Sequence, residues 1–356
     1  MRKYKLQLIP GDGIGVDAIN EANKVLDALE KLDGGVKFER VTQEWSCQYY
    51  LKNGYMMPED GIKILSDSDA ILLGAVGFPN VSDHVSLWGL LLPIRQEFDQ
   101  YVNLRPVKLL KGLKTPLANK EPGSIDFLVV RENTEGEYSG LGGRSRIGTP
   151  YETAIQTSIF SRFGTERILR YAFDIAQKSK RKRLNSVTKS NALNYSMVFW
   201  DSILDIVKKD YPNVETKNTH VDAMAAFFVT KPEEFDVIVA SNLFGDILTD
   251  LGSALLGSIG VAPSANINPE KKYPSMFEPI HGSAPDIAGK GIANPIGTIW
   301  SVKMMLDHIG ENELSKVVMD SIENVCAQGK VITPDLGGKA KTWEVGDEIV
   351  KNILNK

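Results

Sequence analysis

Two aspartates stand four residues apart in the segment Asn242-Leu-Phe-Gly-Asp-Ile-Leu-Thr-Asp250. In a helix, this spacing places both carboxylates on one face, one turn apart. Like charges so placed repel each other unless a cation lies between them, and ligands that are all oxygen favour Mg²⁺ or Mn²⁺ over Zn²⁺. Asp222 is a candidate third carboxylate. The spacing alone leaves two interpretations open: a metal site, or an acidic helix face with a capping or solvated role.

Three arginines are candidates for binding an anionic substrate. Arg95 and Arg105 flank a passage from a helix to a strand, and Arg131 ends another strand. Ligands of open α/β sheets bind beyond the carboxyl ends of the strands. Guanidinium groups pair with carboxylates through two parallel hydrogen bonds, so several arginines together suit a dicarboxylate. For any one of them, taken alone, an ordinary surface ion pair is the better interpretation.

Lys189 and Tyr138 are candidate proton carriers. Lys189 ends a strand in the segment Ser186-Val-Thr-Lys-Ser-Asn191. Close to a metal ion and arginines, a lysine gives up its proton more readily and can act as a base. Either residue alone is also compatible with a structural role.

A glycine-rich turn, Gly11-Asp-Gly-Ile-Gly15, follows a strand and opens a helix. Its spacing is G-x-G-x-G, whereas the dinucleotide fingerprint is G-x-G-x-x-G followed by an acidic residue at the end of a second strand. A tight structural turn and a ligand loop are both open interpretations. The residues that bind a cofactor must therefore be sought elsewhere.

The elements that would position these residues alternate between strands and helices, which predicts a largely parallel α/β sheet. Residues 135–148 and 153–160 are interpreted as a projecting β arm that could serve dimerisation, with a long surface loop as the alternative. The expected strands are 4–9, 36–42, 70–73, 102–107, 125–130, 184–188 and 237–240, and the expected helices are 16–32, 87–100, 162–177, 193–208 and 244–256.

Composition narrows the class of protein. A chain of 356 residues is long enough for about two domains. The net charge of −4 argues against a nucleic-acid binder, and the basic run 178–183 is interpreted as a solvated loop. The two cysteines form no metal-type cluster, which fits a reducing cytoplasm. The N-terminus lacks a signal-peptide pattern, and no apolar run approaches the ~18 residues that span a bilayer.

Taken together, these segments resemble the β-decarboxylating dehydrogenases, which act on isopropylmalate, isocitrate, tartrate or D-malate. The resemblance runs nearly end to end and is most specific in 242–250, 277–286 and 292–295. It implies an α/β fold distinct from the Rossmann type. One domain, formed by residues 1–100 and 257–356, would bind the cofactor. The central domain, residues 101–256, would carry the metal and substrate residues and the dimerisation arm.

The resemblance also implies roles for individual residues. The carboxylates of the substrate would be bound by Arg95, Arg105 and Arg131. A Mn²⁺ or Mg²⁺ ion would be held by Asp246 and Asp250 of one subunit and Asp222 of the other. The catalytic residues would be Tyr138 as proton donor, Lys189 as base, and Asp222. Because Asp222 and Lys189 match residues that reach the partner's active site, the active unit would be a homodimer. A requirement for a monovalent cation such as K⁺ is left open.

The segment from His281 to Asp286 resembles the family's adenosine-binding loop. The carboxylate of Asp286 could accept hydrogen bonds from ribose hydroxyls and would repel a 2′-phosphate, which favours NAD over NADP. His281 and Asn294 would contact the adenine. The full expected cofactor set is Gly74, Glu278, His281, Gly282, Ser283, Ala284, Asp286 and Asn294.

The segment before Arg95 bears on the substrate. Isocitrate enzymes carry Ser and Asn where this chain has Gly89 and Leu91, and isopropylmalate enzymes usually carry Glu where it has Trp88. The resemblance is therefore strongest to members that act on tartrate or D-malate. The alternatives are 3-isopropylmalate oxidation, and a catalytically idle dimeric scaffold or RNA binder. The sequence ranks neither D-malate against the tartrate stereoisomers, nor Mn²⁺ against Mg²⁺, nor dimer against tetramer.

Overall fold

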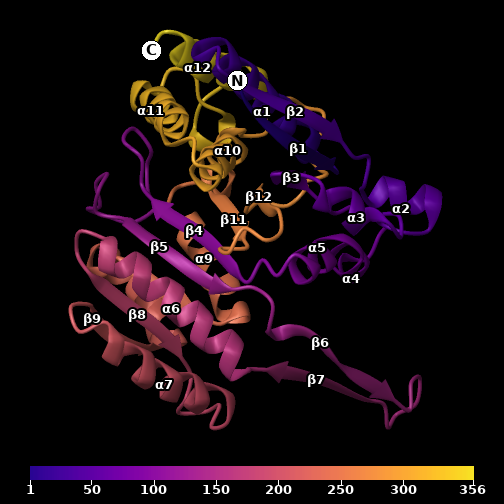
Figure 1. The fold of residues 1–356 in the computed structure, drawn as a ribbon, viewed down its shortest axis with the longest axis vertical. Coiled ribbons are helices and arrows are strands. Elements are labelled where there is room, and N and C mark those ends of the chain that lie inside the picture. Colours follow the sequence, from indigo (N-terminus) through magenta and orange to yellow (C-terminus); the bar gives the residue numbers. More distant parts are fainter. The chain divides into compact units, whose positions relative to one another are not determined.

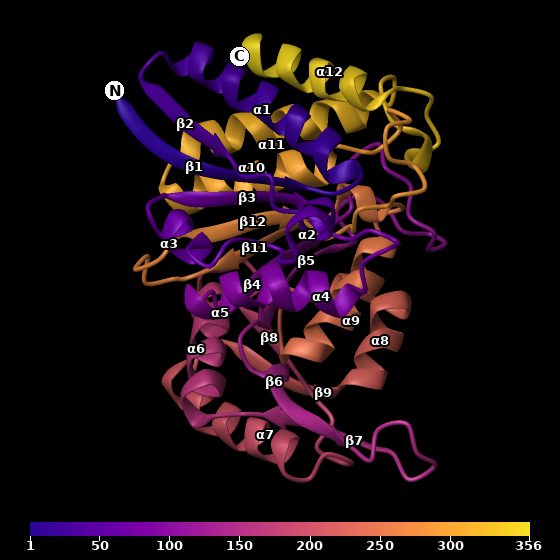
Figure 2. The same ribbon diagram turned by 90° about the vertical axis from the view of Figure 1, so that its right-hand side faces the viewer.

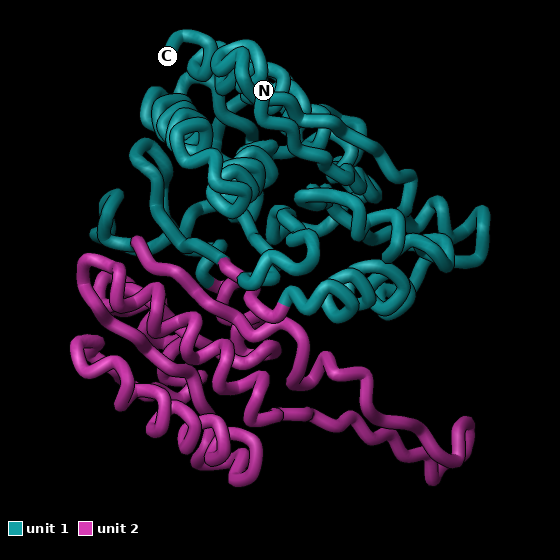
Figure 3. The backbone as a smooth tube through the Cα atoms, viewed as in Figure 1, with its two compact units in different colours: residues 1–100, 105–125, 252–356 teal, residues 101–104, 126–251 magenta.

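The computed structural model describes residues 1–356, which form two compact units (Figure 3). Unit 1 comprises residues 1–100, 105–125 and 252–356, and unit 2 comprises residues 101–104 and 126–251. Residues 105–125 thus belong with the chain ends and not, as expected, with the middle of the chain. One reason is the ion pair of 2.7 Å between Lys108 Nζ and Glu323 Oε1, which ties this segment to the C-terminal part of unit 1.

Unit 1 is built on a sheet in which β12 and β3, β3 and β1, and β1 and β2 pair in parallel, while β11 runs antiparallel to β12. All six residues of β3 are buried, as is usual for a central strand covered on both faces. The strands, in their order across the sheet, are β2 (Val36–Thr42), β1 (Arg2–Gly11), β3 (Ala70–Ala75), β12 (Ser275–Pro279) and β11 (Pro263–Ile267).

Two groups of helices belong to unit 1. The first packs together, α1 against α12 and α10 against α11 (Figures 1 and 2): α1 (Ile14–Asp33), α10 (Ile296–Ile309), α11 (Asn312–Gln328) and α12 (Thr342–Leu354). The second is α2 (Cys47–Asn53), α3 (Gly61–Ser66), α4 (Asp83–Ser86) and α5 (Leu92–Glu97), with a π-helical turn at Leu87–Leu91. Side chains of this second segment, including Leu65 and Ile94, share a buried cluster with Ile9, Ile71 and Leu73 of the strands. The alternate residues of β1 and β3 thus face this cluster.

Unit 2 contains a parallel sheet in which β10 pairs with both β5 and β8, and β8 pairs with β9. Its strands, in order, are β5 (Asp126–Glu132), β10 (Val237–Ala240), β8 (Arg183–Thr188) and β9 (Glu215–His220). Its helices are α6 (Arg162–Lys178), α7 (Ser196–Val207), α8 (Val221–Thr230) and α9 (Asn242–Ala254), whose last residues pass into unit 1. Strand β4 (Val102–Lys108) also carries the chain between the units, and short 3₁₀ turns occupy 208–210, 232–234, 259–261 and 334–336.

A two-stranded antiparallel ribbon, β6 (Gly136–Ser145) with β7 (Thr153–Ile159), projects from unit 2 in Figure 1. The structure therefore has the β arm that the sequence predicted in place of a surface loop. The arm exposes large apolar side chains, among them Leu141, Ile155 and Tyr151. A two-stranded hairpin alone is only marginally stable in water, so this exposed apolar surface is a candidate for burial by a second polypeptide.

Most sequence-based element predictions agree with the structure to within a few residues. The helix expected at 193–208 begins later, at Ser196, because residues 190–195 form turns. The basic run 178–183 joins α6 to β8 as a loop, as predicted. None of the helices is both long and apolar enough to cross a membrane.

Candidate active site

In unit 2, the structure brings together Arg131, Tyr138 and Asp246. Arg131, at the end of β5, is almost fully buried, and its Nη1 forms a hydrogen-bonded ion pair with Asp246 Oδ1. The Tyr138 hydroxyl donates to the other oxygen, Asp246 Oδ2, at 2.9 Å. The Arg131 guanidinium also lies 5.5 Å from the centre of the Tyr138 ring. One carboxylate thus links the expected substrate arginine to the expected proton donor.

Asn242 completes this cluster and was missed in the sequence. Its Oδ1 accepts hydrogen bonds from Arg131 Nε at 3.0 Å and Nη2 at 2.7 Å, and its Nδ2 donates to the Glu135 carbonyl at 3.0 Å. Asn242 therefore fixes the plane of the guanidinium group. The available signal was its place at the first residue of α9, two residues after the end of a strand that ends at the same sheet edge as β5.

Asp246 and Asp250 lie on α9 at the predicted spacing of one helical turn, and Asp250 is exposed. Their oxygen chemistry fits Mg²⁺ or Mn²⁺, which prefer carboxylate ligands. Within this single chain, no three His, Cys, Asp or Glu side chains are grouped closely enough to hold a metal ion. Two carboxylates on one helix are therefore a partial site, which needs a further ligand from water, substrate or another chain.

Lys189 and Asp222 form a second pair in unit 2. Lys189 follows β8 and its Nζ donates to Asp222 Oδ1 at 2.7 Å. Asp222 lies in the first turn of α8, where helix N–H groups favour a negative charge. The hydrogen bond from Lys189 is the largest cause that lowers the pKa of Asp222 below its ordinary value. The Asp222 side chain is 67% exposed, so the pair is open to a ligand or to another polypeptide.

In unit 1, Arg95 on α5 forms a buried ion pair with Glu278 on β12, at 2.8 Å between Nη2 and Oε1. Asn266 Nδ2 donates to the same Glu278 oxygen at 2.7 Å. The Arg95 Nε–H is buried and has no hydrogen-bond partner. A buried guanidinium with an unused donor is suited to a further anion. The third arginine, Arg105, is also buried, on β4.

A cavity of about 590 Å³ in unit 1 is lined by two short segments, 76–83 and 282–285. Ser283 and Gly282 belong to both the cavity wall and the expected cofactor loop. A Cβ atom on Gly282 would meet nothing within 4 Å, so the backbone there is bare toward open space. Ala284 has a positive φ of 38°, and Asp286, two residues later, is exposed. The cavity and its bare backbone fit an extended ligand such as a dinucleotide.

His281, at the start of the same loop, has an unused acceptor. Its Nδ1 lies 3.0 Å from the Gly282 carbonyl, which can only accept, so Nδ1 carries the hydrogen when the ring is neutral. Burial lowers the pKa of His281 and favours this neutral form. Nε2 is then a buried acceptor without a partner. Such an atom is stabilised by an N–H donor, which the exocyclic amine of adenine can supply.

Two expected cofactor residues have structural contacts of their own. Gly74 does not line the cavity. A Cβ at this position would lie 2.4 Å from the Pro10 carbonyl oxygen, so the tight packing of β3 against the Gly11–Gly15 turn requires a glycine. Asn294 donates from Nδ2 to Asp335 at 2.9 Å and accepts from the Ile296 N–H at 3.0 Å. Each of its polar groups thus has a partner within unit 1.

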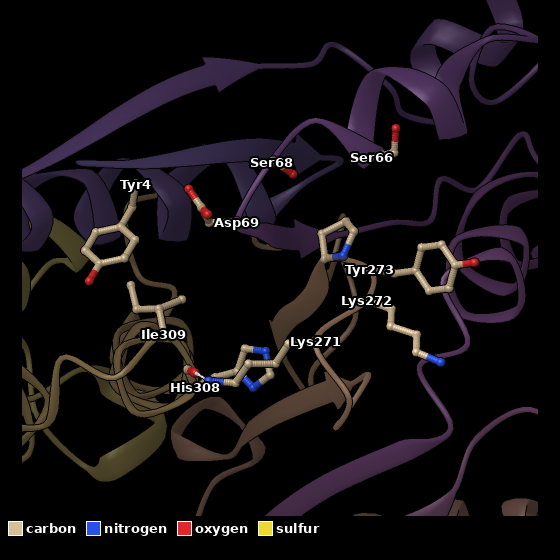
Figure 4. A pocket seen from close by; sticks show the side chains of 10 residues that line it. Tyr4, Ser66, Ser68, Asp69, Lys271, Lys272, Tyr273, His308 and Ile309 are labelled. Carbon is tan, nitrogen blue, oxygen red and sulfur yellow. Dashed lines mark hydrogen bonds between the residues drawn. The ribbon is translucent and has the colours of Figure 1, made fainter. Parts of the chain in front are cut away.

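Another cavity of about 260 Å³ lies near the amino-terminal ends of β1, β3 and β12 (Figure 4). Tyr4, Asp69, Tyr273 and His308 are among its lining residues, and Lys271 donates to the His308 carbonyl at 2.6 Å. None of the expected site residues lines it. In parallel sheets ligands bind beyond the carboxyl ends of the strands. The 590 Å³ cavity lies at such an end, because its lining begins directly after β3.

Known proteins resemble this chain over its whole length. Residues 5–349 match the model of the isocitrate/isopropylmalate dehydrogenase family. A probable tartrate dehydrogenase/decarboxylase of Bacillus subtilis is 54% identical, covering 99% of each chain. The D-malate dehydrogenase (decarboxylating) of Escherichia coli is also 54% identical, again covering 99% of each chain. The crystal structure of isocitrate dehydrogenase from Methylococcus capsulatus superposes with a TM-score of 0.88 at 33% identity, covering 99% of each chain.

The end-to-end agreement confirms the fold that the sequence predicted, an α/β fold of the isopropylmalate/isocitrate dehydrogenase type rather than a Rossmann fold. The resemblance read from 242–250 and 277–286 is confirmed with it. The chain belongs to the isocitrate/isopropylmalate dehydrogenase family, and it is an enzyme of the decarboxylating dehydrogenase type.

Proposed function

We propose that this enzyme oxidises a small 2-hydroxy dicarboxylate, D-malate or tartrate, with NAD as hydride acceptor and Mn²⁺ or Mg²⁺ as cofactor, and that it can decarboxylate the product. The observation that carries the proposal is the cluster around Asp246. A carboxylate suited to a metal ion is joined there to a buried arginine and to a phenol. Relatives 54% identical to this chain that bear the names tartrate and D-malate dehydrogenase support the substrate class.

The metal would be held by Asp246 and Asp250, with Asp222 of the second subunit. When bound, such an ion supplies positive charge that lowers the pKa of a coordinated alcohol and stabilises negative charge on oxygen. The arginines Arg95, Arg105 and Arg131 would bind the carboxylates of the substrate through charge-assisted hydrogen bonds.

Protons and electrons would then move as follows. Lys189 accepts the proton of the C2 hydroxyl while hydride passes from C2 to the nicotinamide, which gives a 2-keto acid. The bond from the β-carboxylate to C3 breaks, and CO₂ leaves without the electron pair. Tyr138 donates its phenolic proton to C3. With D-malate, the products are pyruvate, CO₂ and NADH.

NAD is proposed over NADP because the cofactor loop ends in a carboxylate. Asp286 is exposed and directly follows the last residue of the cavity wall, where it would accept hydrogen bonds from ribose hydroxyls and repel a 2′-phosphate. His281, with an unpaired acceptor on Nε2, suits adenine.

The active form is proposed to be a homodimer with shared active sites. The arm exposes apolar side chains that a second copy would bury, and the exposed Lys189–Asp222 pair would complete the partner's site. The two cysteines, Cys47 and Cys326, are buried and unbridged, which is compatible with the cytoplasm.

The proposal is tested by measuring NADH formation with D-malate, the tartrate stereoisomers and 3-isopropylmalate. Chelator-treated enzyme should be inactive until Mn²⁺ or Mg²⁺ is restored, and Asp250→Asn should lose most turnover. Asp205→Asn is the matched control, since Asp205 lies on α7 and pairs only with Lys208. Full activity after chelation would contradict the metal assignment. A preference for 3-isopropylmalate would contradict the proposed substrate and identify the enzyme as a 3-isopropylmalate dehydrogenase. RNA binding without NADH formation would contradict the proposed dehydrogenase function.

A further inference from the structure

We infer that Asp12 and Gly13 are positioning residues that hold the two walls of the 590 Å³ cavity in place. The inference rests on the proposed use of this cavity by NAD. It assigns the Gly11–Gly15 turn a role that its sequence left open. The turn would act on the cofactor through the loops it fixes, and not as a phosphate-binding loop.

The N–H groups of the turn are largely used within unit 1. The Asp12 N–H donates to the Ala75 carbonyl at 2.7 Å, the Ile14 N–H donates to the Ser283 carbonyl at 2.9 Å, and the Gly15 N–H donates back to Asp12 at 3.0 Å. A phosphate-binding loop instead points its N–H groups at the ligand. The bond from Ile14 attaches the turn to Ser283, which lines the cavity.

Asp12 attaches the turn to the other wall. Asp12 is 2% exposed, and its Oδ2 accepts from two backbone N–H groups, Cys47 at 2.8 Å and Gly77 at 3.2 Å. Oδ1 lies 3.4 Å from the Gln48 N–H. Gly77 lines the cavity, and Cys47 begins α2. A single buried carboxylate therefore sets the distance between the turn, α2 and the loop after β3.

Gly13 sets how closely the turn approaches the second wall. Its φ is 57°, and a Cβ atom would lie 2.0 Å from the Ser283 carbonyl oxygen. The two walls also meet directly, because a Cβ on Gly77 would lie 3.1 Å from Ser283 Oγ. An alanine at position 13 would therefore displace Ser283 away from the turn. The absence of a side chain there is needed for the position of the loop.

The test measures the NADH Kd of the full-length enzyme and of three variants, Asp12→Asn, Gly13→Ala and the control Gly34→Ala, by titration with NADH. An asparagine offers one acceptor oxygen and places an NH₂ group against N–H donors, so we expect its NADH Kd to rise about tenfold. Gly13→Ala should raise the Kd at least as much. Gly34 also has a positive φ, 66°, at the other end of α1, but its Cβ would meet nothing within 4 Å. Gly34→Ala should therefore leave the Kd unchanged.

A purely structural role would give a different pattern. In that case the urea midpoint of Asp12→Asn would fall while its NADH Kd stayed at the wild-type value. That result would overturn the inference. The KM for the dicarboxylate should also change little if Asp12 acts on the cofactor walls alone.

Amide hydrogen exchange on the free enzyme separates this inference from the proposed function. Asp12→Asn should speed exchange in 76–83, and Gly13→Ala should speed it in 281–286. If the wild type fails to bind NADH but these changes occur, the cofactor proposal fails and the positioning role stands. Unchanged exchange in both segments would refute the positioning role.

Discussion

The buried ion pair between Arg95 and Glu278 should contribute measurably to the free energy of unfolding. Its side chains are 8% and 9% exposed, and Glu278 Oε1 accepts from both Arg95 Nη2 and Asn266 Nδ2. Glu278→Ala would leave a buried guanidinium without its counter-ion, and it would also leave both Arg95 Nη2 and Asn266 Nδ2 without their acceptor oxygen. Removing one partner of a buried pair costs about 3–5 kcal/mol. We expect a loss of this size in the free energy of unfolding.

Glu278→Gln is the informative comparison. Its amide oxygen can occupy the place of Oε1 and accept from the same two donors, so only the charge is lost. Hydrogen bonds to charged groups contribute about 1.5–3 kcal/mol and neutral ones about 0.5–1.5 kcal/mol, so the expected cost is about 1 kcal/mol. Without the negative charge beside it, Arg95 should bind an anionic substrate at least as well, and the KM for the dicarboxylate should stay equal or fall.

Urea unfolding followed by circular dichroism measures the stability change, and steady-state kinetics measures the KM. Glu348→Ala is the surface control, because Glu348 pairs with the exposed Lys351 at 3.2 Å. Its effect should stay within about 0.5 kcal/mol. If Glu278→Ala costs no more than Glu278→Gln, then the hydrogen bonds that the glutamine keeps contribute nothing to the stability of the fold, and the reasoning is wrong.

Asp286→Lys with Ile287→Tyr should shift the ratio of kcat/KM values toward NADP; unchanged strict use of NAD would show that other residues set the preference. Burial lowers the pKa of His308 to about 4, from 6.5, so its contribution to stability is complete above about pH 6.5 and is lost as pH falls toward 4. His308→Gln should remove about 2 kcal/mol of the stability difference between pH 7 and pH 5 in urea titrations, and an unchanged pH dependence would exclude His308 as its source. Gly74→Ala should lose about 1–3 kcal/mol, seen as a lower Tm, because its Cβ would lie 2.4 Å from the Pro10 carbonyl oxygen; a wild-type Tm would mean that β3 can shift.

The candidate site residues whose place on a helix or strand the sequence predicted correctly depend on patterns that are local in the chain. The shared face of Asp246 and Asp250 follows from helical geometry over four residues. Arg131 could be placed at the end of a strand because its neighbours Val129 and Val130 form a buried apolar run. Patterns of this kind are imposed by burial of one face of an element, so they remain visible in a single sequence.

The parts that the sequence could not predict join distant segments or lack an apolar pattern. Arg95 and Glu278 are 183 residues apart, and nothing near either residue specifies the other. The strand β9, Glu-Thr-Lys-Asn-Thr-His220, has no buried residue and lies at the end of its sheet, so no apolar alternation marks it. The resemblance placed residues 105–125 with the middle of the chain, whereas they belong to the unit that both chain ends form, and Lys108 pairs with Glu323 near the C-terminus.

The glycine spacing of the Gly11–Gly15 turn differs from that of the dinucleotide fingerprint, and this difference corresponds to a different use of the backbone N–H groups. In a Rossmann domain, the small residues let backbone N–H groups reach a pyrophosphate. Here Ala75, Ser283 and Asp12 itself already accept the hydrogen bonds from three N–H groups of the turn. A dinucleotide in the neighbouring cavity would then have to bind to backbone groups of another segment. Gly282 offers such backbone groups, because it has no side chain and faces open space. The same loop, which ends at Asp286, would then determine the preference between NAD and NADP. The glycines are similar in the two folds, but the atoms that their missing side chains admit are different: a ligand's phosphates in one, the chain's own carbonyl groups in the other.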